Sequence, residues 1–160
     1  FICELIAVGC LVVHGDLRSE RLDKKWHAGE LVKMLEKLHP DFYPRPTKQI
    51  LGTDGKVEST ETIKEGFLSK EELPKLYKML GERLHRGNLR KLVSGTTKEV
   101  DFDEIHQIAR SIRILLNHHQ IQMIDPTFQV WALMQGVEDG NVQVTLFRKL
   151  TEDEVTRLKR

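Results

Sequence analysis

The most basic stretch of the chain, residues 82–91, has side chains that suit the binding of an anion. Four Arg or Lys residues fall there against a single acid, Glu82. Such a cluster can neutralise phosphates, and the candidates for a nucleic-acid or phosphate site are Arg83, His85, Arg86, Arg90 and Lys91. The pattern also fits a solvated helix C-terminus, where cations interact favourably with the helix dipole. A catalytic His85 with an arginine partner is the third interpretation.

A second group of candidates, Arg113, His118 and His119, lies where a predicted helix gives way to a predicted strand. Adjacent histidines point in different directions on either element, so the pair is a poor chelator of one metal ion. His85 or Asp125 would have to complete a metal site with one of them, and the simpler interpretation is a structural or exposed pair. The sequence has no glycine-rich phosphate loop, zinc spacing or EF-hand loop, so we expect no metal and no cofactor.

Two amphipathic helices are predicted to carry these candidate residues. Ser69 and Glu72 have the spacing of a capping box. The apolar residues that follow them at steps of three and four are Leu73, Leu76, Tyr77, Leu80 and Leu84. Asp101 repeats the capping pattern before residues 102–117, whose apolar stripe predicts the clearest helix of the chain. The first helix therefore ends in the basic stretch, and His118–His119 follow the second.

The first 60 residues predict two helices and a hairpin. The apolar run at 1–13 predicts a buried helix, with a buried strand as the alternative because Ile, Val and Gly are frequent in it. Residues 30–38 predict a second helix, and the proline-rich loop after it is expected to be anchored to the core by Phe42 and Tyr43. An Asp-Gly pair between short apolar stretches predicts a short hairpin near 49–59.

The last third of the chain changes from a helical period to a strand period. Alternating apolar residues predict strands over 120–124, 128–135 and 142–148, and turn residues separate the three segments. Strands joined by short turns pair antiparallel, so these segments predict a three-stranded antiparallel meander. The expected fold class is α+β, mostly helical, with this meander at the C-terminus.

Length and composition predict one domain without a strong overall electrostatic field. A chain of 160 residues can bury a real core. Its 39% hydrophobic and 31% charged residues are typical of a globular protein. The net charge of +1 gives no global attraction to nucleic acid or membrane, so RNA binding would need a local patch. Because residue 1 is Phe and stands within an apolar run, we expect residues 1–160 to be a single domain that lacks its N-terminal part.

The sequence predicts a cytoplasmic protein with no membrane partner. The apolar run at 1–13 is shorter than the roughly 20 residues that cross a bilayer, and it lacks the basic leader of a signal peptide. Cys3 and Cys10 would lie too far apart on a helix or on a strand for a disulfide. Two unpaired thiols fit a reducing compartment.

Two short motifs resemble segments of a known bacterial family. The pattern LYKMLGERLHRG at 76–87, the LNHH junction at 116–119 and the C-terminal hairpin are similar to segments of helical proteins of the HEPN-like type. The resemblance covers residues 65–135. Active HEPN-like ribonucleases carry an arginine and a histidine with four to six residues between them; the arginine binds phosphate and the histidine assists chemistry at the 2′-hydroxyl. The pairs of this spacing here are Arg21 with His27, and Arg113 with His118 or His119.

The resemblance implies a scaffold or binding module of the bacterial cytoplasm, tied to phage defence or toxin regulation. An enzyme is the lesser expectation, because a polar residue usually follows the motif's arginine whereas Leu22 and Ile114 do here. One alternative is a metal-independent ribonuclease, with Arg113 and either His118 or His119 facing a shared cleft across a homodimer. Another is a winged-helix DNA-binding domain, although the hairpin tip Glu138-Asp139 is acidic. RNA or another protein is the expected partner.

Overall fold

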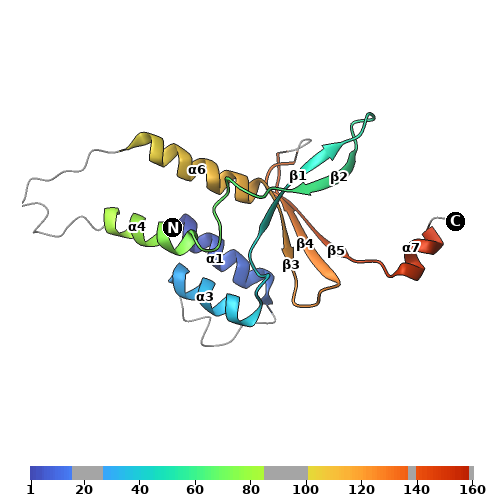
Figure 1. The fold of residues 1–160 in the computed structure, drawn as a ribbon, viewed down its shortest axis with the longest axis horizontal. Helices are drawn as coiled ribbons and strands as arrows, with labels where there is room; N and C mark the ends of the chain where they lie inside the picture. The colour runs from blue at the N-terminus through green and yellow to red at the C-terminus, as the bar shows by residue number, and fades with distance from the viewer. Residues whose placement is uncertain (16–26, 85–100, 137–139, 159–160) are drawn as a thin grey trace, which may run out of the picture.

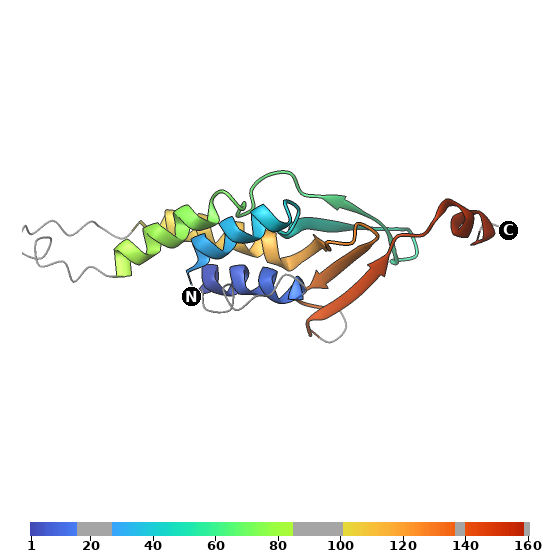
Figure 2. The same ribbon diagram turned by 90° about the horizontal axis from the view of Figure 1, so that it is seen from below.

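The computed structural model describes residues 1–15, 27–84, 101–136 and 140–158. Within them, all the helices but the C-terminal one gather at one end of the molecule, and the sheet lies beside them (Figure 1). The helices are α1 (Ile2–Val13), α3 (Ala28–Leu38), α4 (Leu73–Leu84), α6 (Phe102–Asn117) and α7 (Glu152–Leu158). The strands are β1 (Arg45–Leu51), β2 (Val57–Thr62), β3 (His118–Gln122), β4 (Phe128–Leu133) and β5 (Gln143–Arg148). Figure 2 shows α7 beyond the sheet, at the opposite end from the other helices. In the described ranges no helix is both long and apolar enough to cross a membrane.

The five strands form one sheet in the order β2-β1-β3-β4-β5, and all neighbours are antiparallel. The expected α+β class is correct, but the mostly helical fold with a three-stranded C-terminal meander is wrong. The hairpin expected near 49–59 is longer than predicted and joins the meander, because Arg45 and Pro46 pair with Gln120 and His119. Periodicity is a local signal, so it could not reveal a pairing between segments that lie far apart in the chain.

Two helix starts follow the predicted capping patterns. Before α4, the Glu72 amide donates to Ser69 Oγ at 3.2 Å, and the Ser69 amide donates to the Glu72 carboxylate at 2.9 Å. Before α6, the Glu104 amide donates to the Asp101 carboxylate at 3.0 Å. Each bond satisfies an amide that has no partner inside its helix. Pro74 falls in the first turn of α4, where its missing N–H costs least.

The hydrophobic core lies mainly among the helices. The helix predicted for the first 13 residues is confirmed, and its alternative as a strand is wrong. Phe42 joins the core from the loop before β1, and Leu115 joins it from the end of α6. The other buried members are Cys3, Ile6, Ala7, Cys10, Leu11, Ala28, Leu31, Val32, Leu35, Tyr43, Leu68, Leu73 and Leu76. Because β3 begins directly after α6, the packing of Leu115 in the core also positions the first residue of β3.

Candidate functional site

A cavity of about 510 Å³ lies where α6 meets the sheet. Arg113 and Asn117 line it from α6, and His118 lines it from the first position of β3. Thr47 and Gln49 of β1 form part of the opposite wall. The structure therefore brings Arg113 and His118, two of the three catalytic candidates, to one cavity.

His118 is held by a hydrogen bond inside this cavity. The side chain is buried, with 5% of its surface exposed, and its Nδ1 lies 2.9 Å from Thr47 Oγ1. Burial lowers the pKa of His118, because the charged imidazolium loses its hydration. The ring is therefore neutral at pH 7. A hydroxyl can donate to a ring nitrogen or accept from it, so this bond holds the orientation of the neutral imidazole and is compatible with both tautomers.

His119 belongs to a different environment. Successive side chains of a strand point to opposite faces, so His119 leaves the cavity that His118 lines. Its Nδ1 lies 2.9 Å from the Leu116 carbonyl, to which it donates, and burial lowers its pKa. The two histidines cannot serve one catalytic centre within a single chain. Across the part of the chain that the structure describes, no three His, Cys, Asp or Glu side chains come together as ligands for a metal ion.

The basic stretch is described only at its start. Arg83 forms an ion pair with Glu104 of α6, so much of its charge is neutralised by a neighbour. His85, Arg86, Arg90 and Lys91 lie outside the described residues. The structure therefore places one of the five phosphate-binding candidates, and it places that one in a contact between two helices.

A larger cavity, of about 1,010 Å³, is formed by α1, α4 and the start of α3. On its wall the Tyr77 hydroxyl donates to the Glu4 carboxylate at 3.0 Å, and this bond lowers the pKa of Glu4. The His27 ring contacts Tyr77 edge-on, with centroids 4.7 Å apart. Sequence reasoning missed this group because its three members come from three separate segments. The hydroxyl and the carboxylate are engaged with each other, and the contact joins α1 to α4.

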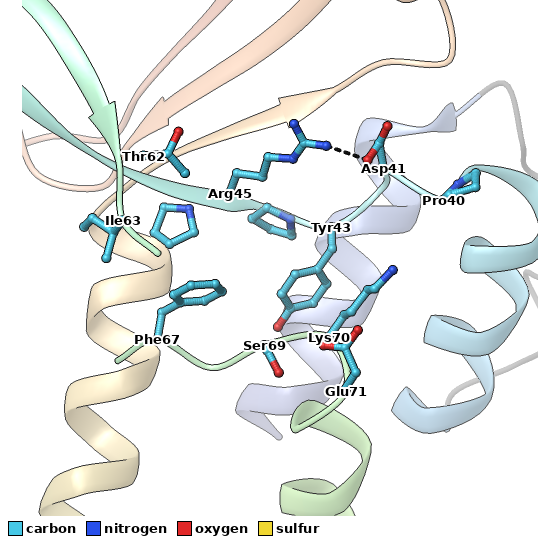
Figure 3. A pocket seen from close by; sticks show the side chains of 12 residues that line it. Pro40, Asp41, Tyr43, Arg45, Thr62, Ile63, Phe67, Ser69, Lys70 and Glu71 are labelled. Carbon is cyan, nitrogen blue, oxygen red and sulfur yellow. Dashed lines mark hydrogen bonds and ion pairs between the residues drawn. The ribbon is translucent and has the colours of Figure 1, made fainter. Parts of the chain in front are cut away.

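A third hollow, of about 230 Å³, lies beside the loop that leads into β1. Figure 3 shows Arg45 reaching Asp41 at its sheet side. The Tyr43 hydroxyl donates to the Leu68 carbonyl at 3.0 Å. Phe42 and Tyr43 are both buried, so the predicted anchoring of this loop is confirmed. We assign the hollow a structural role, because its tyrosine and its arginine are both engaged by the protein.

One face of the sheet is rich in amide and hydroxyl side chains and reaches solvent at its β5 side. Strand register and alternation place these residues on what we call the glutamine face: Arg45, Thr47, Gln49, Thr60, Thr62, His118, Gln120, Gln122, Gln129, Trp131, Leu133, Gln143, Thr145 and Phe147. The residues named from β1, β3, β4 and β5 include no carboxylate. Trp131 and Phe147 form a tilted ring pair with centroids 4.6 Å apart, and Phe147 is 44% exposed. At its α6 end, the glutamine face continues into the cavity that Arg113 lines.

A chain of hydrogen bonds holds the Trp131 ring in place. The indole Nε1–H of Trp131 donates to Gln129 Oε1 at 3.2 Å, and the Gln129 amide donates to Gln122 Oε1 at 2.9 Å. The Gln122 amide in turn donates to the Phe128 carbonyl at 2.8 Å. His118 contacts the same indole ring edge-on, with centroids 6.0 Å apart. The indole is therefore held in one orientation by the protein itself.

Sequence reasoning missed the glutamine face, although a signal for it was present. Glutamine alternates with apolar residues at 120–122, and Gln129 and Trp131 stand two apart on the next predicted strand. A period of two puts such residues on one side of a strand. What the pattern does not contain is the register that sets Trp131 against Phe147.

Replacing Thr47 by Val is expected to lower the free energy of unfolding by about 1–3 kcal/mol. Valine keeps the shape of threonine but leaves the buried Nδ1 of His118 without its 2.9 Å partner. Urea denaturation of both proteins measures the difference. Thr62→Val is the matched control, because Thr62 is an exposed residue of the same face, where a surface change costs less than about 0.5 kcal/mol. Equal losses in the two variants would contradict the predicted role of the bond.

Comparisons with known proteins leave these residues as the basis for any functional conclusion. The chain matches no protein-family model, no curated protein and no solved structure.

Proposed function

We propose that this protein is a binding module that takes single-stranded RNA across the glutamine face of its sheet. The observation that carries the proposal is the ring pair of Trp131 and Phe147, with centroids 4.6 Å apart, on the part of the face that β3, β4 and β5 form and that has no carboxylate. That face leads into a cavity that contains an exposed arginine, Arg113. The arrangement offers aromatic surface for bases, amides for base edges and a cation for a phosphate.

The two aromatic rings supply the main attraction. Stacking of a base on an aromatic side chain contributes about 1–3 kcal/mol and tolerates any base, because every base has a π-face. Phe147 is 44% exposed and accessible to a base, and the bonded Trp131 backs it. Unpaired bases can be splayed onto such a surface, whereas the bases of a duplex are stacked on each other. The module therefore prefers single strands.

Arg113 is the cation best placed to meet a phosphate. It is exposed on α6, lines the cavity with His118 and has no ion pair among the described residues. Lys48 lines the same cavity, but its Nζ lies 2.8 Å from a Glu61 carboxylate oxygen. With one or two phosphate contacts, the logarithm of the binding constant falls with the logarithm of the salt concentration at a slope of about −0.7 per contact. The proposal thus implies a weak salt dependence.

The test is the anisotropy of a fluorescein-labelled single-stranded RNA of mixed sequence, about 12 nucleotides long, a length that one domain can cover. Phe147→Ala is expected to weaken binding about 5–150-fold, the equivalent of one lost stacking contact. Arg113→Ala is expected to make the slope of the logarithm of the binding constant against the logarithm of the salt concentration less negative by about 0.7, the equivalent of one phosphate contact. The matched controls are Phe102→Ala and Arg110→Ala, which remove an exposed ring and an exposed arginine of α6.

Two results would reject the proposal. One is a folded protein that does not bind the labelled strand at low salt. The other is a Phe147→Ala variant that binds as well as the Phe102→Ala control. A duplex of the same sequence tests the preference for single strands, since it is expected to bind more weakly.

A second candidate function, RNA cleavage without a metal, rests on one further observation. Arg113 and His118 line the same cavity, and a neutral imidazole can act as a general base. Incubating the labelled strand with the protein in EDTA tests this function. Cleavage that is lost in both Arg113→Ala and His118→Ala would make the binding module a ribonuclease. An intact strand that is nevertheless bound would restrict the function to binding.

A further inference from the structure

The two edges of the sheet are built differently. At the β2 edge, Glu58 and Glu61 place charges on the strand, and the β1–β2 register shifts between Ile50 and Leu51. Charges and irregularities of this kind discourage another strand from pairing with an edge. At the β5 edge every residue is exposed, no described strand pairs with the outer side, and Arg148 at the end of the strand is its only charged residue.

The backbone of β5 has hydrogen-bonding groups that point outward from the sheet. The Lys149 amide donates to the Thr127 carbonyl at 2.7 Å, so odd-numbered positions of this segment face β4. In an antiparallel strand the direction of the backbone groups alternates with each residue. The amides and carbonyls of Val144 and Leu146 therefore point away from β4, toward an edge that no described strand occupies.

We infer that β5 joins two copies of this chain into a dimer, through antiparallel β5–β5 pairing centred on Thr145. In this register Val144 of one copy lies opposite Leu146 of the other, twice, and these pairs exchange backbone hydrogen bonds. Gln143 lies opposite Phe147, and the two Arg148 side chains fall at opposite ends of the interface. Like charges directly opposite each other destabilise a pairing, so this separation favours the register.

Neighbouring registers fit less well. Opposite residues must lie on the same face of the joined sheet. The two-fold axis of the dimer must therefore pass through a residue of β5, and the other registers are obtained by moving it to a neighbouring residue. Centring on Leu146 sets Val144 against the charged Arg148. Centring on Val144 sets Arg148 against Gly140, which lies outside the strand. The Thr145 register alone among these three pairs the two aliphatic residues with each other.

A second copy of the chain is the partner that fits β5, because antiparallel pairing sets the outward-pointing backbone groups and the aliphatic side chains of one copy against those of the other. Val144 and Leu146 are 65% and 60% exposed on the face opposite the glutamine face. In the dimer, Val144 and Leu146 of both copies form one row of four aliphatic side chains. In each copy this row lies beside the half-buried Val130 of β4. The two-fold axis stands perpendicular to the sheet, so both glutamine faces lie on the same side of a continuous sheet. The inference itself does not rest on RNA binding.

Sedimentation velocity of the full chain over a wide range of concentrations, without RNA, tests the dimer. The wild-type chain of 18.6 kDa is expected to approach twice this mass as its concentration rises. Leu146→Lys is expected to remain monomeric, because it sets lysines into the aliphatic row. Val57→Lys is the matched control on the other edge, since Val57 is an exposed aliphatic residue of β2, and it is expected to dimerise like the wild type. A monomeric wild type, or a Leu146→Lys variant that still dimerises, overturns the inference and leaves the proposed function untouched.

A cysteine scan tests the register even if Leu146→Lys fails to fold. Thr145 is its own partner at a non-hydrogen-bonded position, where Cα atoms are about 4.5 Å apart, within the range that a disulfide spans. Thr145→Cys is therefore expected to give a covalent dimer under mild oxidation. Gln143→Cys, opposite Phe147, is expected to give much less. The native Cys3 and Cys10 are buried and add little background. Equal cross-linking of the two variants would overturn the Thr145-centred register.

Discussion

Replacing Phe42 by Ala is expected to lower the free energy of unfolding by about 3–5 kcal/mol, the range for large aromatic side chains in a core. Phe42 is 0% exposed and its ring meets Tyr43 edge-on, with centroids 5.8 Å apart. Removing the ring leaves a cavity among the helices that the close-packed surroundings can fill only in part. Equilibrium denaturation in urea, with the same slope for both proteins, measures the loss.

Phe102→Ala supplies the control for this prediction. Phe102 is the first residue of α6 and is 68% exposed, so its removal is expected to change stability by less than about 0.5 kcal/mol. Two residues, Tyr43 and Pro44, separate Phe42 from β1, and β1 carries Thr47 of the candidate site. The mutation therefore also tests whether the helical core supports the sheet. A loss near that of Phe102→Ala would show that the loop is not anchored by this ring.

The helices could be predicted from the sequence because their signals are local. A cap and an apolar stripe set α6, and the structure gives the predicted 102–117. The capping box of Ser69 and Glu72 likewise forms as predicted. Such patterns operate over a few residues, and an amphipathic stripe needs only some apolar partner to pack against.

The sheet could be predicted only in part, because strand pairing is not a local property. The pairing of β1 with β3 is described by two residue pairs, Arg45 with Gln120 and Pro46 with His119. The alternation of residue types within either segment does not indicate which other segment it pairs with. Once this pairing exists, however, it brings Thr47 to His118 and so builds one wall of the candidate cavity.

The candidate site shows the same division. Arg113 and His118 could be singled out by residue type, and one turn of helix is enough to bring both to the same cavity. The sequence predicts that the adjacent histidines diverge on either element, but which of them lines the cavity depends on the boundary: α6 ends at Asn117, so both are strand residues and His118 takes the cavity side. The pair of Trp131 with Phe147 depends on the β4–β5 register, which residue types do not encode.

Acidification from about pH 6.5 to pH 5 is expected to destabilise the fold through three buried histidines, His14, His118 and His119. Burial lowers the pKa of each one. Their pKa in the unfolded chain is about 6.5, so below this pH the unfolded state binds protons that the folded state does not. Stability therefore rises with pH across this window and is lost as pH falls. Each histidine that stays neutral in the folded state contributes up to about 1.4 kcal/mol per pH unit.

Carboxyl groups act in a different window. The pKa of Glu4 is lowered by the hydrogen bond from Tyr77, and that of Asp125 is lowered by bonds from Thr127. A carboxyl group with a lowered pKa stabilises the fold above its unfolded pKa and loses this contribution as pH falls through its folded pKa. For these groups the loss lies below about pH 4.5, so a slope measured between pH 6.5 and 5 reports the histidines.

His14→Gln separates one histidine from the other two. His14 is 1% exposed, its Nε2 lies 3.3 Å from the Phe42 carbonyl, and no described residue bonds its Nδ1. A proton added at Nδ1 would thus be buried without a partner beside His39, whose ring centroid is 5.0 Å away. Urea denaturation at several pH values is expected to show that the slope of the free energy of unfolding against pH is reduced by up to about 1.4 kcal/mol per pH unit in the variant.

His106→Gln, an exposed replacement on α6, is the matched control. An unchanged slope in His14→Gln would mean that His14 takes up its proton inside the folded protein, and the acid sensitivity would then have to arise at the His118–His119 junction.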